Sequence, residues 1–264
     1  MKILLSFLLI IFVFYLFIVL FIYFIQEKIL FHPVKIDENY EFKFKETFVE
    51  KFYKTPNNGL INSLRFTVQN PNGIVLYLHG NAGSLKDWAL VYPQFTSRGY
   101  DVEIIDYRSY GKSKGKLSEE NLYNDVQYIY SEILKDFPEN NIIIHGRSIG
   151  TGMASKLCSE NNPKSLILES PYYNIYDIAK KVLPIFPIKN MLKYKFESNV
   201  FLQKVKGPIT ILHGKKDQVI PFGSGLKLFN SVKEKTIFIE FEEGTHSNLA
   251  SFKEYHKTLD EVLN

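Results

Sequence analysis

The stretch Gly-Arg-Ser-Ile-Gly at residues 146–150 constrains the fold of this chain more than any other feature. It follows the apolar run 141–145, Asn-Ile-Ile-Ile-His, and opens a helix-compatible stretch from Thr151 to Glu160. This order predicts a strand, a tight turn with a serine at its apex, and a helix. The glycines at both ends of the turn fit this prediction, because side chains there would collide with the neighbouring strand and helix.

A serine on such a turn is exposed for nucleophilic attack, which makes Ser148 the candidate nucleophile. A second Gly-x-Ser-x-Gly pattern, at 111–115, lies in a polar stretch well before the next helical pattern, so its context favours Ser148 over Ser113. The same stretch ends like a phosphate-binding loop. That motif needs glycine where Asp106 stands, so we predict no nucleotide site.

A serine hydroxyl attacks only when a base takes its proton, so a histidine and an acid must follow. The apolar strand 208–212 leads into a loop that carries Asp217, and the last strand, 236–241, leads into a loop that carries His246. The order Ser, Asp, His is that of alpha/beta hydrolases. His246 is then the base and Asp217 holds its tautomer. Glu169, at the end of the strand 165–168, is the alternative acid.

Acyl transfer also needs hydrogen-bond donors for the developing oxyanion. The glycine-containing loop 78–83, Leu-His-Gly-Asn-Ala-Gly, follows the apolar strand 74–78. We predict the backbone N–H groups of Ile149 and Asn81 as the two donors. The alternative is a flexible turn with no catalytic part.

The rhythm of the chain after residue 46 predicts an alpha/beta fold. Two alternating stretches, 47–54 and 60–68, predict a hairpin. From Ile74 onward short apolar strands alternate with helical segments, which predicts a mostly parallel sheet with helices on both faces. In such folds the ligand site lies at the carboxyl ends of the strands, where every candidate residue falls. We therefore expect one alpha/beta-hydrolase domain over 46–264.

The amino-terminal segment predicts a membrane anchor. Residues 3–25 are 23 residues without a charge, and 20 of them are Leu, Ile, Val or Phe. A helix of this length reaches about 34 Å, enough to cross a hydrocarbon core of about 30 Å. No small-residue cleavage site follows, which favours an uncleaved signal anchor (1–25) and a juxtamembrane segment (26–45) over a cleaved signal peptide.

The charges that flank this segment are nearly balanced, with Lys2 on one side and Lys28 and Lys35 on the other. The very short amino-terminal tail favours a cytoplasmic tail with the catalytic domain on the extracytoplasmic side.

One insertion interrupts the rhythm at about 171–205, between the strand that ends at Glu169 and the strand that leads to Asp217. It is rich in aromatic residues, and Lys180, Lys181, Lys189, Lys193 and Lys195 face only two carboxylates, Asp177 and Glu197. We expect a small cap over Ser148 that selects the acyl or alcohol group. Its lysines predict either contact with anionic lipid or a solvated face.

Composition excludes several other classes of site. The single cysteine, Cys158, excludes an internal disulfide and a multi-cysteine zinc site, and no His-Glu-x-x-His spacing occurs. We predict no metal and no cofactor. A net charge of +4 without a recognisable motif does not indicate nucleic-acid binding.

Seven segments together resemble the membrane-anchored alpha/beta-hydrolase-domain family, serine hydrolases with one amino-terminal span. They are 26–33, 79–83, 106–113, 146–150, 169–171, 213–217 and 244–246. The resemblance implies the triad Ser148, Asp217 and His246. One departure is Ser109, where such proteins commonly carry glycine. The family acts on different esters and thioesters, so the resemblance supplies no single substrate.

These features together predict a membrane-anchored serine hydrolase that cleaves an ester or thioester. Proximity of the site to the bilayer favours lipid or lipidated substrates. A peptidase or an acyltransferase would use the same triad, and a hydrolase-fold scaffold that binds a partner or lipid without turnover is the non-enzymatic alternative.

Overall fold

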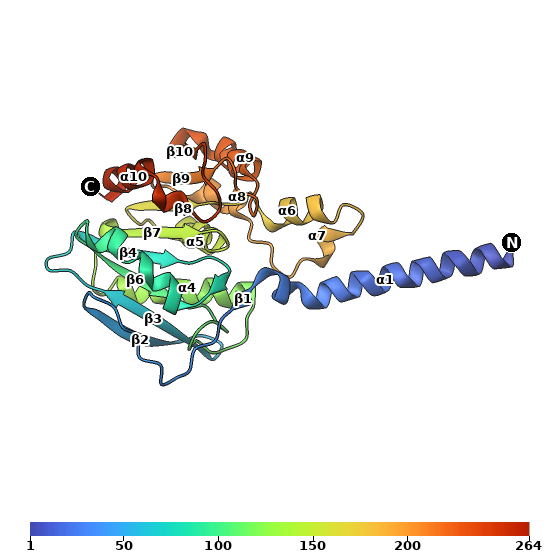
Figure 1. Ribbon diagram of the computed structural model, residues 1–264, viewed down its shortest axis with the longest axis horizontal. Helices are drawn as coiled ribbons and strands as arrows, with labels where there is room; N and C mark the ends of the chain where they lie inside the picture. The colour runs from blue at the N-terminus through green and yellow to red at the C-terminus, as the bar shows by residue number, and fades with distance from the viewer. Residues whose placement is uncertain (264) are drawn as a thin grey trace.

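An eight-stranded sheet forms the centre of the domain in the computed structural model, which describes residues 1–263 (Figure 1). Its strand order is β10-β9-β8-β7-β4-β6-β3-β2. All neighbours from β10 to β6 are parallel, whereas β3 pairs antiparallel with both β6 and β2. The strands alternate with helices from residue 73 onward, as the sequence predicts. A short parallel pair, β1 with β5, lies apart from this sheet.

The strands are β1 His32–Pro33, β2 Phe48–Thr55, β3 Gly59–Phe66, β4 Gly73–Leu78, β5 Ala82–Gly83, β6 Tyr100–Ile105, β7 Ile142–Arg147, β8 Ser165–Glu169, β9 Ile209–Gly214 and β10 Thr236–Phe241. The α-helices are α1 Lys2–Leu30, α2 Leu85–Trp88, α3 Pro93–Thr96, α4 Glu119–Ile133, α5 Gly150–Glu160, α6 Ile175–Val182, α7 Ile188–Met191, α8 Ser198–Phe201, α9 Phe222–Val232 and α10 Lys253–Leu263.

The central strands bury both faces of the sheet, which explains their continuous apolar runs. Within β4, Leu76 faces a core covered by α4, α5 and α9, whereas Val75 and Tyr77 face a second core covered by α2, α3 and α10. Helices therefore cover both faces of the sheet, and the loops at the carboxyl ends of the parallel strands are where a ligand site is expected. The predicted alpha/beta class is confirmed.

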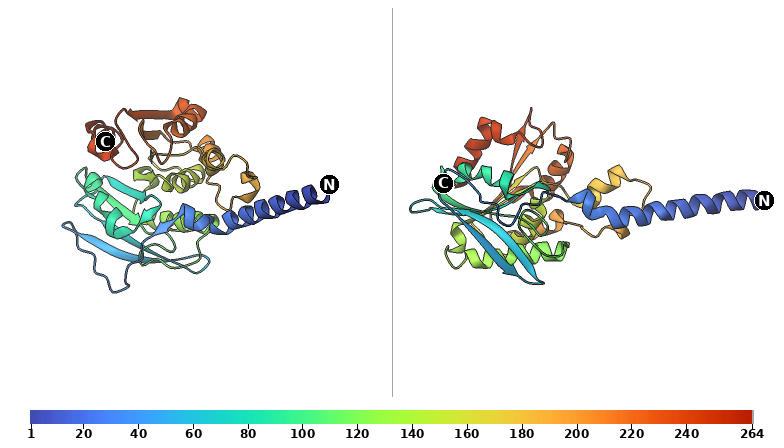
Figure 2. Two further views of the ribbon diagram at one scale, coloured as in Figure 1. Left: turned by 45° about the vertical axis from the view of Figure 1, so that its right-hand side comes forward. Right: turned by 60° about the horizontal axis from the view of Figure 1, so that its bottom comes forward.

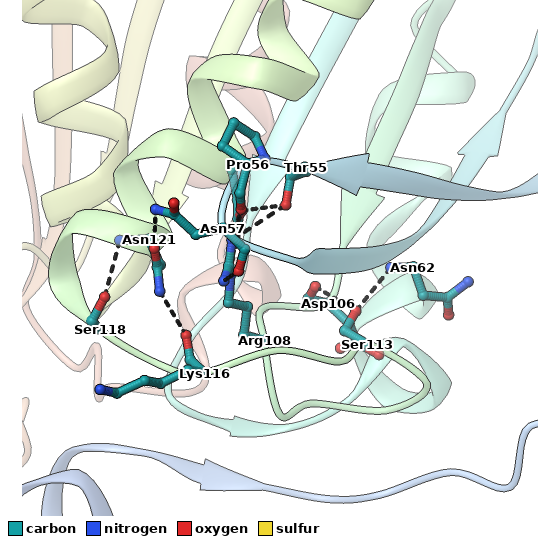
Figure 3. Close-up of polar contacts among 11 residues, drawn as sticks. Thr55, Pro56, Asn57, Asn62, Asp106, Arg108, Ser113, Lys116, Ser118 and Asn121 are labelled. Atoms are coloured by element: carbon teal, nitrogen blue, oxygen red, sulfur yellow. Dashed lines mark hydrogen bonds and ion pairs between the residues drawn. The ribbon is translucent and has the colours of Figure 1, made fainter.

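The hairpin β2–β3 is attached to α4 through one fully buried cation. The Arg108 guanidinium lies 2.7 Å from Asp125 of α4. It also donates to the carbonyl oxygens of Pro56 and Asn57 in the hairpin turn (Figure 3). Paired and hydrogen-bonded on every side, this buried charge fixes the hairpin against the domain.

Helix α1 projects away from the domain, and the cap lies beside its base (Figures 1 and 2). The helix is long and apolar enough to cross a membrane, and it runs on without a break to Leu30, five residues past the predicted span. The cap consists of α6, α7 and α8 with their connecting loops, within the predicted insertion.

Ser109 stands in a backbone conformation that favours glycine, the residue common at this position in the family that the sequence resembles. Its φ is +72°, in the left-handed region that costs a non-glycine residue about 1–2 kcal/mol. Replacing Ser109 with glycine should relieve this strain and, after the greater chain entropy of glycine, raise the free energy of unfolding by roughly 0.5–1 kcal/mol. Thermal unfolding in detergent measures the change.

The matched control is Ser97→Gly, where φ is −62°, so glycine relieves no strain, adds its entropic cost and removes the hydrogen bond from Ser97 Oγ to Pro93 O. Ser97→Gly should lower the unfolding temperature. An unfolding temperature that also falls for Ser109→Gly would contradict the strain argument.

Candidate active site

Ser148 lies at the apex of a sharp turn between β7 and α5. Its φ is +51°, a left-handed conformation, and its N–H donates to Glu169 O at 2.9 Å. The turn leaves no room for side chains at its ends: a Cβ on Gly146 would lie 2.7 Å from Ala154 Cβ, and one on Gly150 would overlap Leu78 O. Local sequence therefore dictates the strained turn, as expected for a nucleophile elbow.

The structure brings together the three residues predicted as a triad. His246 Nε2 lies 3.1 Å from Ser148 Oγ, and His246 Nδ1 lies 2.8 Å from Asp217 Oδ2. An ionised carboxylate only accepts, so Nδ1 carries the proton and Nε2 is free to accept the Ser148 proton. Ser148 and Asp217 are buried, and the His246 side chain is partly exposed.

The Asp217 carboxylate is held by its own loop. Its Oδ1 accepts from the backbone N–H groups of Val219 at 2.9 Å and Ile220 at 2.8 Å. Burial raises the pKa of Asp217, but the hydrogen bonds from His246 and Ile220 outweigh it and hold the pKa below its ordinary value. Beneath this loop His213 is buried against Ile220 O, and burial lowers its pKa, so it stays neutral.

Glu169, the alternative acid, faces a different set of partners. Its carboxylate lies 3.2 Å from Arg147 Nε and 3.3 Å from His145 Nε2, and it accepts from Tyr255. Burial raises the pKa of Glu169, but Arg147 and His145 together lower it below its ordinary value. Arg147 also donates to His246 O at 3.1 Å, so this pair supports the histidine loop.

Sequence reasoning missed Arg147. A cation directly before the candidate nucleophile and a carboxylate at the end of the next strand were the available signals, since Arg147 and Glu169 are register partners in β7 and β8.

Ser113, in the second Gly-x-Ser-x-Gly pattern, uses its hydroxyl in two hydrogen bonds to the backbone. Its Oγ accepts from Asn62 N and donates to Asp106 O, each at 2.8 Å, and the side chain is buried (Figure 3). It bonds the loop after β6 to β3, away from His246.

The loop predicted to supply an oxyanion donor approaches Ser148 closely, since a Cβ on Gly80 would lie 3.6 Å from Ser148 Cβ. His79 Nδ1 lies 2.6 Å from Gly80 O. Because a trans peptide places its N–H opposite its C=O, this contact orients the N–H of Asn81 as well. The other predicted donor, Ile149 N–H, lies at the amino-terminal end of α5, where N–H groups have no helical partner.

An apolar cavity of about 300 Å³ lies against Ser148. Its walls come from the cap, from the loop after β9 and from the last turn of α1. The lining residues are Ile29, Leu30, Asn81, Ser148, Ile149, Tyr172, Ile175, Ile178, Ala179, Val182, Leu183, Val219 and Ile220.

A protein-family profile described as serine aminopeptidase, S33, matches residues 69–200, half of the chain, and this hydrolase profile includes the elbow. The chain belongs to this hydrolase family. A lysophosphatidylserine lipase of Mus musculus (ABHD12) is 33% identical over 65% of the chain and 48% of its own length, and the Xenopus tropicalis lipase of that name is 36% identical over 60% and 46%. The chain thus spans about half the length of these lipases.

An uncharacterized protein of Acanthamoeba polyphaga mimivirus is 29% identical over 88% of both chains. Among solved structures, an esterase of Pyrococcus furiosus superposes with a TM-score of 0.71 at 17% identity, over 89% of this chain and 97% of its own. An alpha-beta hydrolase from Vibrio vulnificus gives 0.69 at 20% identity, over 82% and 81%. These likenesses confirm the predicted alpha/beta-hydrolase fold, and the family confirms the predicted hydrolase class.

Replacing Asp217 with asparagine should lower kcat for a short-chain ester by roughly 10³–10⁴-fold, because an amide no longer holds the productive His246 tautomer. The folded structure should persist, since the substitution conserves shape. Steady-state hydrolysis together with thermal unfolding measures both effects. Asp260→Asn on the surface of α10 is the matched control, and a loss below tenfold in Asp217→Asn would contradict the assigned role.

Replacing Glu169 with glutamine should act mainly on stability. Loss of a buried partner of Arg147 should cost about 3 kcal/mol at pH 7. Because the folded pKa of Glu169 is lowered, the stability from its ionisation is fully present above the unfolded value of about 4.3 and lost as pH falls through the folded value.

The unfolding temperature of the wild type should therefore fall more steeply below about pH 4.5 than that of Glu169→Gln. Unfolding curves from pH 3 to 7 test this, with Glu261→Gln on exposed α10 as control. Parallel curves for wild type and Glu169→Gln would refute it.

Proposed function

We propose that this chain is a membrane-anchored serine hydrolase that cleaves the ester or thioester of a single-chain acyl lipid. The observation that carries the proposal is the cavity at Ser148, whose wall includes Ile29 and Leu30 of the membrane helix. A nucleophile next to an apolar cavity bounded by the anchor suits an acyl chain taken from the membrane.

The chemistry follows from the contacts around Ser148. Its Oγ attacks the acyl carbonyl carbon as its proton passes to His246 Nε2, and the N–H groups of Ile149 and Asn81 stabilise the oxyanion. The C–O or C–S bond then breaks, His246 returns the proton to the leaving group, and an acyl-enzyme remains on Ser148. Water, deprotonated by His246, then attacks the acyl carbonyl carbon, the bond from the acyl carbon to Ser148 Oγ breaks, and His246 returns the proton to Ser148 Oγ as the acid leaves. Asp217 stabilises the charged imidazole in both halves.

The nature of the cavity favours an acyl chain over a peptide. Among its described lining residues there is no carboxylate to pair with the free amino group of an aminopeptidase substrate. A volume of about 300 Å³ is at the low end for ligand pockets, which suits one chain better than two. The relatives named lysophosphatidylserine lipases support the same substrate class, a lipid with one acyl chain.

The anchor is a single-pass helix in this proposal, with the catalytic domain on the extracytoplasmic side of the membrane.

A fluorophosphonate probe should label the detergent-solubilised protein on Ser148. Labelling should disappear in Ser148→Ala and persist in Ser113→Ala, because Ser113 only bonds the β6 loop to β3. Gel fluorescence after labelling measures this. Persistent labelling of Ser148→Ala would refute the nucleophile, and an unlabelled, folded wild type would favour a binding scaffold.

A further inference from the structure

The cap carries an apolar segment enclosed by lysines. Residues 182–188 read Val-Leu-Pro-Ile-Phe-Pro-Ile, with Lys180 and Lys181 before them and Lys189 after. Lys193 and Lys195 follow, and no carboxylate occurs between Asp177 and Glu197. Apolar residues with flanking lysines are the pattern of a segment that enters a membrane interface while its lysines stay at the headgroups.

This segment runs alongside the part of α1 that carries no charged residue. At the base of the cap, Gln26 donates to Met191 O at 2.7 Å and accepts from Lys193 N at 2.9 Å. Farther along the helix, Tyr15 donates to Ile185 O at 3.1 Å and its ring stacks on Phe186. Tyr15 is eleven positions before Gln26 in the helix, so these two sets of contacts lie about 16 Å apart along α1.

Two large apolar side chains of this segment are exposed, an arrangement that is unfavourable in water. Ile185 is 74% exposed and Val182 is 72% exposed. Closer to the domain than this segment, Lys193 Nζ lies 4.5 Å from the centre of the Tyr23 ring, and we take this pair as the level of the lipid headgroups. Aromatic and basic side chains gather at that level of a membrane protein. Residues 183–187 lie beyond it, toward the middle of the span.

We propose that residues 182–188 insert into the hydrocarbon of the same leaflet as the base of α1, and that the Ser148 cavity opens into that leaflet. The occupant of the exposed apolar surface is lipid. Two observations carry this assignment: the segment contacts α1, and lysines flank it in the sequence. Both place the segment inside the bilayer whenever α1 spans it.

Two adjoining cavities mark the proposed route of an acyl chain from the leaflet to Ser148. A smaller apolar cavity of about 80 Å³ lies between α1 and the cap helices α6 and α7. It shares five wall residues with the Ser148 cavity, namely Ile29, Leu30, Ile175, Ala179 and Leu183. An acyl chain entering between α1 and α6 would therefore reach Ser148 without passing through water. This route rests on the proposed function, whereas insertion of the segment does not.

Insertion is tested with one fluorophore on the full chain. The only cysteine, Cys158, is buried, so Cys158→Ala combined with Ile185→Cys leaves one labelling site. In phosphatidylcholine vesicles containing phosphatidylserine, an environment-sensitive dye at residue 185 should be quenched by lipids brominated on the acyl chain and not by aqueous iodide. Ile237→Cys on β10, exposed to 61%, is the control and should show the reverse. Iodide quenching at both sites would overturn the proposal.

Access from the leaflet is tested with Ile185→Glu, a residue outside both cavity walls. Hydrolysis of a long-chain monoacyl lipid held in vesicles should fall by roughly tenfold or more, because a carboxylate is strongly disfavoured in hydrocarbon. Hydrolysis of a soluble short-chain ester should not change. Ile237→Glu should leave both rates unchanged. Equal lipid hydrolysis by wild type and Ile185→Glu would refute the route, whereas a wild type inactive on both esters would refute the proposed function and leave the quenching result standing.

Discussion

The left-handed backbone at Ser148 is the constraint on which the rest of the site depends. A non-glycine residue adopts this conformation only when its surroundings fix it, and here three features do so. Gly146 and Gly150 allow β7, β4 and α5 to approach the turn, and Glu169 O accepts from the Ser148 N–H. The parallel pairing of β7 with β8 supplies that carbonyl. The central sheet therefore stabilises the position of the hydroxyl, and the outer strands and cap are built around it.

Glu169 links the Ser148 turn to the loop that carries His246. Its carbonyl oxygen holds the Ser148 turn, and its side chain holds Arg147, which in turn donates to His246 O. A buried carboxylate and guanidinium are costly unless each is fully paired, and these also contact His145, Tyr255 and Trp88. In the proposed mechanism Asp217 is therefore the acid, and Glu169 positions the Ser148 turn and the His246 loop.

Local pattern predicted the fold and the candidate residues because each depended on short-range rules. Strand ends in a parallel sheet share one edge, so Asp217 and His246 could be placed near Ser148 from their spacing alone. The sequence favoured Asp217 as the acid but left Glu169 open as the alternative, since Glu169 ends β8 and Asp217 follows the neighbouring strand β9. Only three-dimensional register shows Glu169 facing Arg147 and Asp217 facing His246. Likewise, the exposure of residues 182–188 depends on how the cap packs along α1, which periodicity does not encode.

The long apolar helix α1 and the Ser148 cavity share residues, so the helix that could cross a membrane also shapes the candidate site. Gln26 is the one buried residue of α1, and its amide bonds the cap on both sides of the turn between Met191 and Lys193. One helical turn farther on, Ile29 and Leu30 form part of the Ser148 cavity. By composition, the apolar span ends at residue 25. The helix itself continues to Leu30, and its last turn packs against the domain. The last turn of α1 packs as part of the folded domain, because without it the cap would lose its bonds to Gln26 and the cavity would lose a wall.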